Sequence, residues 1–276
     1  MTSFSDAEFV ILDVETTGLS PRYGHRLIEV AAIKIRNLKP VETFHSLVNP
    51  QRDVPFAAFL VNGISPDLLR DAPPADEILP EFFSFLGKES FWVGHNIKFD
   101  LGFLEYEASS ASLDFSPGKN VLCTVKIAKA LLPDLRRYPL WYVAETLGIE
   151  GAQEHRALSD CEMTFQVFLR LIQIAQRKDV YDLNALLTLF GQIKAQNLID
   201  IKEKVNAFER AISFQKGLKL VYFSSSQGGV TFRAVRPLRI VKEKGKVCLQ
   251  AFCHLRNEER LFRLDRIMEW EEKEAA

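Results

Sequence analysis

The sequence predicts a two-part α/β protein, in which a mixed sheet flanked by helices precedes a small β-barrel. Over the first 176 residues, short apolar runs typical of buried strands alternate with segments of helical periodicity. After residue 210, short strand-like runs follow one another, separated by tight-turn sequences. We therefore expect an α/β domain over residues 7–176, a helical connector over residues 177–209 and a barrel over residues 210–270.

The first predicted strand ends in two carboxylates. A short apolar run precedes Asp13, and a Thr-Thr-Gly turn sequence follows Glu15. Because alternate side chains of a strand point to opposite faces, Asp13 and Glu15 share one face. The turn is expected to leave the backbone amides of Thr16 and Thr17 free for a phosphate or a sugar. An isolated Asp-x-Glu pair is more often two solvated acids at a strand end.

A further acid follows a short strand in the middle of the chain. Residues 91–93 read as a strand, Gly94 breaks it, and His95 and Asn96 come next. Asp100 then opens a segment of helical apolar periodicity. An acid in the first turn of a helix also serves as ordinary charge compensation for the helix dipole.

The last candidates, His155 and Asp160, lie where a loop enters an amphipathic helix. Their spacing of five residues corresponds to about 500° of helical rotation, so they do not share a helix face. The apolar periodicity begins after Asp160, which predicts a loop position for His155 and a first-turn position for Asp160. There, an imidazole can take a proton from water as a general base while the aspartate binds a metal. Taken alone, a loop histidine is more typical of an ordinary surface.

Together, the four acids predict a metal centre. Four carboxylates that meet in one pocket repel one another unless cations neutralise them. Two divalent cations about 3.5–4 Å apart are a common device for in-line attack on phosphate. Carboxylate oxygens favour Mg²⁺ or Mn²⁺ over Zn²⁺. The set therefore points to phosphodiester hydrolysis.

The three segments resemble the DEDDh exonucleases, the proofreading-subunit-like branch of the ribonuclease-H-like superfamily. The matching sequences are D-V-E-T-T-G-L, V-G-H-N-I-K-F-D and H-R-A-L-S-D, and the resemblance spans residues 7–176. His155 distinguishes this branch from the sister branch that carries tyrosine there. One departure is Cys123, where many relatives carry an aspartate that is not part of the metal set.

The resemblance implies a ribonuclease-H-like mixed sheet and a 3′→5′ exonuclease with two divalent cations, Mg²⁺ or Mn²⁺. It implies that Asp13 bridges both cations and that His155 is the general base. Glu15 and Asp160 would hold the cation that activates water, and Asp100 the cation at the leaving oxygen. The expected substrate is a nucleic acid with a free 3′ end, and the products are nucleoside 5′-monophosphates. We expect this end to be single-stranded, because the terminal nucleotide must be unpaired to enter a compact pocket. The candidate substrate contacts are Thr16, Thr17, Leu19, His95, Asn96 and Phe99.

Composition fits a cytoplasmic enzyme. The chain has 276 residues, 47% hydrophobic and 26% charged, and its four cysteines form no C-x-x-C pair. Its first residues lack a basic segment followed by an apolar core, and no apolar run approaches the length of a membrane span. We therefore expect no disulfide framework and no membrane partner.

The net charge is unevenly distributed. Residues 211–276 contain 13 Lys/Arg against 8 Asp/Glu, whereas the whole chain has a net charge of −1. A basic segment on a nuclease chain favours contacts with phosphate, although basic side chains also decorate solvated strand faces. The strand-like runs that carry these charges are Leu218–Ser224, Val230–Val241, Lys246–Cys253 and Arg260–Ile267.

The alternation of these runs places arginines among apolar residues. In residues 232–240, Arg236 shares a face with Phe232 and three aliphatic residues, and residues 260–266 show the same mixture. Because arginine is rarely buried without a partner, these arginines either pair with internal acids such as Asp265 or line an anion-binding pocket. A β-bulge near the proline that follows Arg236 would instead turn that arginine outward.

Residues 210–270 resemble a WYL domain, an SH3-like barrel. The matching sequences are L-V-Y, R-A-V-R-P-L, A-F-C-H-L-R and R-L-F-R-L-D-R-I, whereas Val247-Cys248-Leu249 replaces the tripeptide that names the family. That replacement removes two aromatic rings that could stack on a ligand. The resemblance implies a nucleotide or nucleic-acid ligand, with Tyr222, Arg236, Arg256, Arg263 and Arg266 as candidate contacts.

The competing interpretation is a catalytically silent regulator that binds nucleic acid through the barrel. It predicts the loss of one of the acids or of the histidine, and all five are present. A proofreading subunit of a polymerase complex would use the same chemistry, but the chain carries no polymerase motif.

Overall fold

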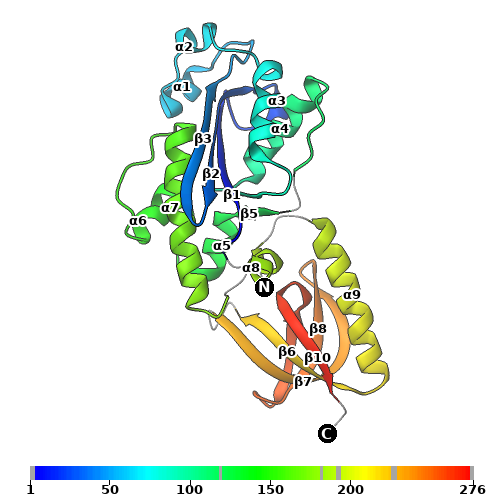
Figure 1. Ribbon diagram of the computed structural model, residues 1–276. Helices are drawn as coiled ribbons and strands as arrows, with labels where there is room; N and C mark the ends of the chain where they lie inside the picture. Colours follow the sequence, from blue (N-terminus) through cyan, green and yellow to red (C-terminus); the bar gives the residue numbers. More distant parts are fainter. Residues whose placement is uncertain (1–3, 118–119, 181–182, 191–193, 225–228, 274–276) are drawn as a thin grey trace. The chain divides into compact units, whose positions relative to one another are not determined.

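The computed structural model describes residues 4–117, 120–180, 183–190, 194–224 and 229–273. The chain divides into two compact units, residues 2–173 and residues 174–276 (Figure 1). Part of the predicted connector, residues 181–182 and 191–193, lies outside the described residues. Among the helices that the structure describes, none is long and apolar enough to cross a membrane.

The first unit is built on a five-stranded mixed sheet in the order β3-β2-β1-β4-β5. β1 pairs antiparallel with β2 and parallel with β4, so the strand pairing changes from antiparallel to parallel at the central strand, β1. The predicted mixed α/β fold is therefore confirmed for this unit. The strands are β1 Phe9–Thr16, β2 Leu27–Arg36, β3 Lys39–Leu47, β4 Phe91–Gly94 and β5 Val121–Cys123.

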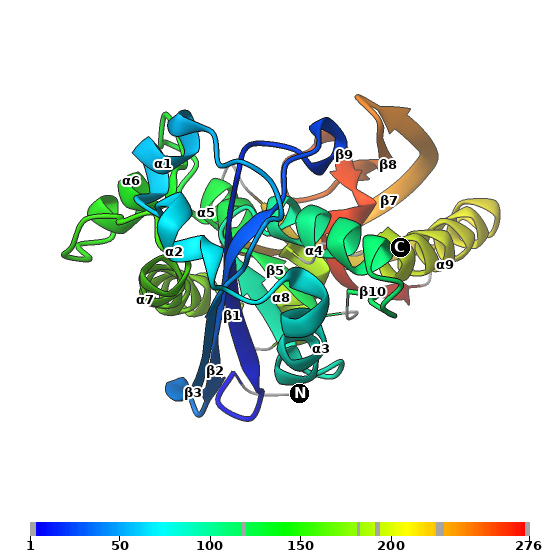
Figure 2. The ribbon, with the colours of Figure 1, turned by 90° about the horizontal axis from the view of Figure 1, so that it is seen from above.

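Helices cover both faces of this sheet, with α3 and α4 on one side and α7 on the other (Figure 2). Because of this double cover, the apolar residues of β1 are buried on both faces. Phe9 of β1 packs edge-on against Phe168 of α7, with ring centroids 5.1 Å apart. The helices of this unit are α1 Phe56–Asn62, α2 Pro66–Arg70, α3 Ala75–Leu86, α4 Lys98–Ser110, α5 Thr124–Leu131, α6 Leu140–Thr146 and α7 Ala157–Gln176.

The second unit is an antiparallel five-stranded sheet in the order β10-β6-β7-β8-β9. In the described residues β9 does not pair with β10, so the sheet is open and differs from the closed barrel that we expected. A 3₁₀ turn, Leu264–Arg266, follows β9 and leads the chain to β10, which pairs with β6 instead. The strands are β6 Gly217–Ser224, β7 Gly229–Glu243, β8 Lys246–Cys253, β9 Glu258–Arg263 and β10 Ile267–Lys273.

A long helix, α9 (Lys194–Ser213), covers one face of this sheet, and the shorter α8 (Leu183–Phe190) precedes it. Phe208 of α9 is fully buried and belongs to one core cluster with Leu249 and Phe262 of the sheet. This apolar contact explains how an open sheet is stabilised, because the helix removes the apolar face from water.

The core face of β7 is the opposite of the one we expected. Phe232 is 75% exposed and Arg236 is also exposed, whereas Val235 is buried. The two-residue period of a strand gives two faces but does not say which one is buried, and the exposed Phe232 makes the wrong face look apolar. The pairing with β8 shifts register between Pro237 and Arg239, at the position where a bulge was predicted.

Candidate active site

The first acids lie at the carboxyl end of β1, in the middle of the sheet. Asp13 pairs with Ala31 of β2 and Glu15 pairs with Glu29, so both side chains leave the strand on the same face. Asp100 comes from the first turn of α4, and its Oδ1 accepts a hydrogen bond of 3.1 Å from the backbone amide of Val14. This bond fixes the beginning of α4 against the strand that carries the first two acids.

A glycine allows α4 to approach β1 so closely. A side chain at Gly94 would bring its Cβ to 2.9 Å from the side chain of Ile97 and 3.2 Å from the carbonyl oxygen of Leu12. Asn96 then adopts a left-handed backbone conformation with φ 66°, which asparagine tolerates better than most residues. Gly94 and Asn96 of the V-G-H-N sequence therefore suit the tight turn that delivers Asp100.

The remaining candidates come from the beginning of α7. His155 lies on the preceding loop, with a left-handed φ of 53°, and Asp160 lies in the first turn of the helix and is 3% exposed. One potential ligand atom from each of Glu15, His155 and Asp160 lies within 4.8 Å of the other two. The structure thus brings these three residues together, although the sequence separates them by up to 145 positions.

Burial and mutual repulsion make the carboxylates of this cluster hard to ionise. Burial, and then the charges of Asp100 and Glu15, raise the pKa of Asp13 well above its usual value. Burial, followed by repulsion from Asp160, raises the pKa of Glu15 to about 8, and burial raises the pKa of Asp100 to about 7. Burial also raises the pKa of Asp160. Among the described residues, no lysine or arginine forms an ion pair with any of these four acids.

One oxygen of the cluster is left without a hydrogen-bond partner. The Oδ1 atom of Asp160 is buried and unpaired within the described residues, whereas Oδ2 accepts a bond of 2.5 Å from Nε2 of Gln153. An unpaired buried carboxylate oxygen is costly, and such atoms in native proteins call for an explanation such as an ion. The all-oxygen donor set and the unpaired oxygen fit a hard divalent cation.

Known proteins show the same architecture. The sequence profile described as "Exonuclease" matches residues 10–168, more than half of the chain, and the profile described as "WYL domain" matches residues 203–272. This chain belongs to the exonuclease family. Both resemblances that the sequence motifs indicated are therefore confirmed.

This chain is similar to parts of longer bacterial proteins. It is 33% identical over 233 residues to a DNA polymerase III PolC-type of Caldanaerobacter subterraneus subsp. tengcongensis, covering 82% of this chain and 16% of the relative. It is 36% identical over 165 residues to the 3′-5′ exonuclease DinG of Bacillus subtilis, covering 60% of this chain and 18% of DinG. The chain thus spans less than a fifth of the length of either relative.

A solved structure of exonuclease X in complex with 5′ overhanging duplex DNA is also similar to this chain. The TM-score is 0.50 and the sequence identity is 26%, covering 61% of this chain and 93% of that one. The similarity therefore extends over nearly all of a single exonuclease domain.

A buried glutamate that the sequence analysis missed holds the exonuclease motifs together. Glu29 of β2 is fully buried and accepts hydrogen bonds from Nη2 of Arg156 at 2.6 Å and from the backbone amide of Ala157 at 2.8 Å. His45 approaches the same carboxylate at 2.8 Å. Although burial opposes it, these bonds hold the pKa of Glu29 below its usual value. A glutamate inside the apolar run L-I-E-V-A-A-I was the available signal.

The candidate substrate contacts differ in what their polar atoms do. The backbone amide of Thr17 donates to the carbonyl oxygen of Arg26 at 2.9 Å, so the expectation that this amide is free is wrong. The hydroxyl of Thr16 donates to the carbonyl oxygen of Gly18 at 2.7 Å. Leu19 is 86% exposed, which leaves it available for a substrate base.

Two further candidates, His95 and Phe99, are engaged by neighbouring parts of the exonuclease domain. The ring nitrogens of His95 lie 2.8 Å from the Thr124 hydroxyl and 2.8 Å from the Tyr138 carbonyl oxygen. Burial lowers the pKa of His95 to about 4. Phe99 is half-buried, and its ring centroid lies 5.1 Å from that of Phe103. His95 therefore joins the turn after β4 to the chain on either side of α5.

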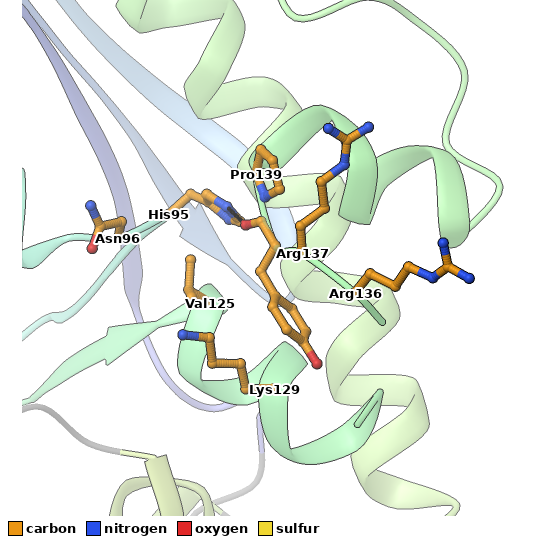
Figure 3. Close-up of a pocket in the computed structure, with 8 residues that line it drawn as sticks. His95, Asn96, Val125, Lys129, Arg136, Arg137 and Pro139 are labelled. Atoms are coloured by element: carbon orange, nitrogen blue, oxygen red, sulfur yellow. Dashed lines mark hydrogen bonds between the residues drawn. The ribbon is translucent and has the colours of Figure 1, made fainter. Parts of the chain in front are cut away.

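A pocket of about 650 Å³ opens beside His95 and Asn96 (Figure 3). α5 contributes Lys129 and Val125, and the loop after α5 contributes residues 136–139. The sequence analysis did not single out these basic residues, although the run R-R-Y-P-L-W mixes basic and aromatic residues in a way typical of nucleic-acid contacts.

The candidate ligand contacts of the second unit do not all have free polar groups. Arg263 pairs with Asp265 through bonds of 2.9 and 2.5 Å, although the internal pairing was considered for the arginines on the other face of the run, Arg260 and Arg266. Arg236 and Arg256 are exposed. The remaining candidates are half-buried, with Tyr222 packed edge-on against Phe262 at 5.2 Å and Arg266 in the 3₁₀ turn after β9.

Proposed function

We propose that this chain is a metal-dependent 3′→5′ exonuclease that hydrolyses phosphodiester bonds at nucleic-acid 3′ ends and releases nucleoside 5′-monophosphates. One observation carries the proposal: four acids, two of them buried and two half-buried, converge with no lysine or arginine paired to them in the described residues, around a carboxylate oxygen that has no hydrogen-bond partner there. The relative named 3′-5′ exonuclease DinG and the similar structure of exonuclease X with DNA support it.

The acids Asp13, Glu15, Asp100 and Asp160 would hold two divalent cations, Mg²⁺ or Mn²⁺. Bound there, such cations would stabilise negative charge on the phosphate and make water a better nucleophile. The chain supplies the rigidity that this arrangement requires, because Asp100 is bonded to the amide of Val14 and α7 begins at the carboxylate of Glu29. Fixed ligands of this kind need no rearrangement during the reaction.

His155 is proposed as the general base that takes a proton from the attacking water. It lies on a loop close to Glu15 and Asp160, where an imidazole can reach a water molecule beside both acids. Its neighbour Arg156 is held by Glu29, so the loop is anchored one residue away from the base. Leu19 and Asn96, both exposed, are proposed to contact the terminal nucleotide of a single-stranded 3′ end together with Thr16, Thr17 and Phe99.

We propose residues 7–176 as the catalytic domain and residues 210–270, with α9 packed on their sheet, as a domain that binds nucleic acid or another anionic ligand. This second domain would direct or gate the nuclease. The proposed contacts are Tyr222, Arg236, Arg256 and Arg266, whereas the guanidinium of Arg263 is already bonded to Asp265. The four cysteines are free and buried, which fits a reducing compartment such as the cytoplasm.

The test uses 5′-labelled single-stranded DNA and RNA oligonucleotides with Mg²⁺, with Mn²⁺ and with EDTA. We expect a ladder that shortens from the 3′ end, requires a metal and is absent in Asp13→Asn. Asp114→Asn is the matched control, because it makes the same chemical change at a side chain that is 92% exposed. This control variant should digest the oligonucleotides like the wild type. If neither polymer were digested although metal is bound, the proposed activity would be wrong.

A further inference from the structure

The pocket beside His95 and Asn96 lies at the same edge of the sheet as the acids. β1, β4 and β5 run parallel, so their carboxyl ends meet at this edge. β5 is two strands away from β1, which corresponds to about 10 Å at the usual strand spacing. That distance is a span of a few nucleotides at a rise of about 3.4 Å per nucleotide.

The chain around this pocket is basic, although the rest of the exonuclease domain is not. Residues 125–142 contain four Lys/Arg and a single acid, Asp134. Lys129, Arg136 and Arg137 are exposed, and no ion pair joins any of them to a carboxylate within the described residues. A polyanion that approaches the acid cluster would therefore meet its attractive charge here.

Aromatic rings position two of these cations. The guanidinium of Arg137 lies 4.5 Å from the ring centroid of Trp141 and 5.0 Å from that of Tyr142. The ammonium of Lys129 lies 5.6 Å from the ring centroid of Tyr138. Such contacts limit the conformations of the side chains while leaving their hydrogen-bond donors free for an anion.

The two walls of the pocket are joined to each other and to the active-site turn. His95 contacts both Thr124, at the beginning of α5, and the carbonyl oxygen of Tyr138, on the loop that carries the arginines. Figure 3 shows Lys129 extending toward the side that carries His95 and Asn96, whereas Arg136 and Arg137 extend on the opposite side. The distance between the acids and the cations is therefore set by the fold and not by a mobile loop.

We propose that Lys129, Arg136 and Arg137 bind backbone phosphates of the substrate strand on the 5′ side of the scissile bond. The assignment rests on the proposed exonuclease function and extends it from the terminal nucleotide to the strand behind it. Backbone phosphates are the ligand that this chemistry fits, because the pocket offers charge and stacking surfaces at its rim.

The first test measures binding in the full chain carrying Asp13→Asn, so that the strand is not cut. Fluorescence anisotropy of a labelled single-stranded oligonucleotide is followed over a series of salt concentrations. We expect Lys129→Gln to weaken binding about tenfold, as loss of one hydrogen bond to a charged group does. The slope of log K against log salt should fall by about 0.7, the value for one phosphate contact on a single strand.

Matched controls make this test specific. Lys39→Gln and Arg36→Gln remove the same charges from exposed positions at the other end of the sheet, beside the amino end of β1, and should leave affinity and slope unchanged. Arg137→Gln should act in the same direction as Lys129→Gln. An unchanged slope in both pocket variants would overturn the proposal, and so would an equal change in the controls.

The second test compares KM values of otherwise unaltered chains for a long oligonucleotide and for a dinucleotide. Because the dinucleotide does not reach the pocket, Lys129→Gln should raise the ratio of the two KM values about tenfold. An unchanged ratio would contradict the proposal. If wild-type protein digested neither substrate, the exonuclease function would fail, while the anisotropy series would still decide whether the pocket holds a strand.

A free mononucleotide offers the same phosphate chemistry, and a competition experiment separates the two sources. Thymidine 5′-monophosphate is titrated against the bound oligonucleotide in the Asp13→Asn chain, with and without Lys129→Gln. The proposal predicts that the mononucleotide competes equally well with both. If Lys129→Gln weakened binding of the mononucleotide but not of the oligonucleotide, the pocket would hold a single nucleotide. That result would overturn the strand assignment.

Discussion

The two units differ in how their buried charges are balanced. In the exonuclease domain, the half-buried Asp13 and the buried Asp160 form no ion pair with a lysine or arginine of the described residues, and burial raises the pKa values of both. In the second unit, Arg263 is bonded twice to Asp265, and the buried ammonium of Lys204 donates to the carbonyl oxygen of Ile267 at 2.7 Å. Charged side chains that have partners within the chain stabilise the fold, whereas buried charges without such partners indicate a binding site for an ion or another ligand.

The same contrast holds within the exonuclease domain. Glu29 is as deeply buried as any residue of the site, yet its pKa is lowered because Arg156 and the amide of Ala157 satisfy it. The pKa of Glu15, its neighbour across the strands, is raised to about 8. Burial alone therefore does not distinguish the proposed metal-binding acids from Glu29; the absence of a positively charged partner in the described residues does.

The largest effect on kcat should come from removing the charge of Asp160, whose Oδ1 has no hydrogen-bond partner in the described residues. Asp160→Asn is expected to lower kcat by about 10³-fold or more, since the loss of several kcal/mol of charge stabilisation costs a factor of ten for each 1.36 kcal/mol. Single-turnover digestion of a labelled oligonucleotide measures it. A variant that retained near-normal kcat would show that this carboxylate does not hold a metal.

A second variant sharpens the comparison by separating a base from a ligand. His155→Ala should lower kcat by about 10²–10⁴-fold, the usual contribution of a general base. Its affinity for Mn²⁺ should stay close to that of the wild type, because the four carboxylates remain. Calorimetric titration checks this, and a parallel loss of Mn²⁺ affinity would make His155 a ligand.

Removing a charge that has a partner within the chain should lower the stability of the fold. Glu29→Gln leaves Arg156 without its partner and weakens the beginning of α7, so the free energy of unfolding should fall by roughly 2–4 kcal/mol, less than for a fully buried pair because the Arg156 side chain is 40% exposed. Urea unfolding of metal-free protein measures the change. An unaltered unfolding midpoint would remove Glu29 from its structural role.

The unbalanced acids should make the metal-free protein less stable as pH rises. Glu15 and Asp100 have pKa values raised to about 8 and about 7, above those of an unfolded chain. Their protonated forms are favoured in the folded state, so the contribution of these two groups to stability is most favourable below the unfolded pKa values and is lost as pH rises toward 8. Asp13→Asn should reduce this loss and raise the melting temperature at pH 8, by about 2–4 °C for each kcal/mol regained. A lower melting temperature in the variant at pH 8 would contradict this.

The smallest effect is expected in the second unit. Arg263→Met should cost about 1 kcal/mol, because its pair with Asp265 is partly exposed and Lys246 remains near that carboxylate. Thermal unfolding of the full chain measures it. A loss comparable to that of Glu29→Gln would show that the pair is more important for the fold than its exposure indicates.

Sequence reasoning found the acids because each depends on local pattern. Strand alternation gave the shared face of Asp13 and Glu15, and the beginning of a helical period gave the positions of Asp100 and Asp160. Glu29 escaped it because its role depends on groups more than 120 residues away in the sequence. The Thr17 amide was misjudged for a similar reason, since its acceptor belongs to the next strand-forming segment.

The second unit was predicted less well because its pattern leaves two choices open. Alternation in β7 does not say which face is buried, and the exposed Phe232 favoured the wrong one. A run of short strands also does not say whether the two edge strands pair, and in the described residues β9 and β10 do not pair with each other. Contacts between distant segments decide both questions, and these are invisible to a local pattern.

The central claim is that the chain leaves its acid cluster for cations to neutralise. Calorimetric titration with Mn²⁺ at neutral pH, in two buffers of different ionisation enthalpy, tests it directly by counting the protons released. Because raised pKa values keep protons on Glu15 and Asp100 in the metal-free protein, binding should release protons, and Asp13→Asn should weaken it strongly. Binding without proton release, or no binding at all, would contradict the account.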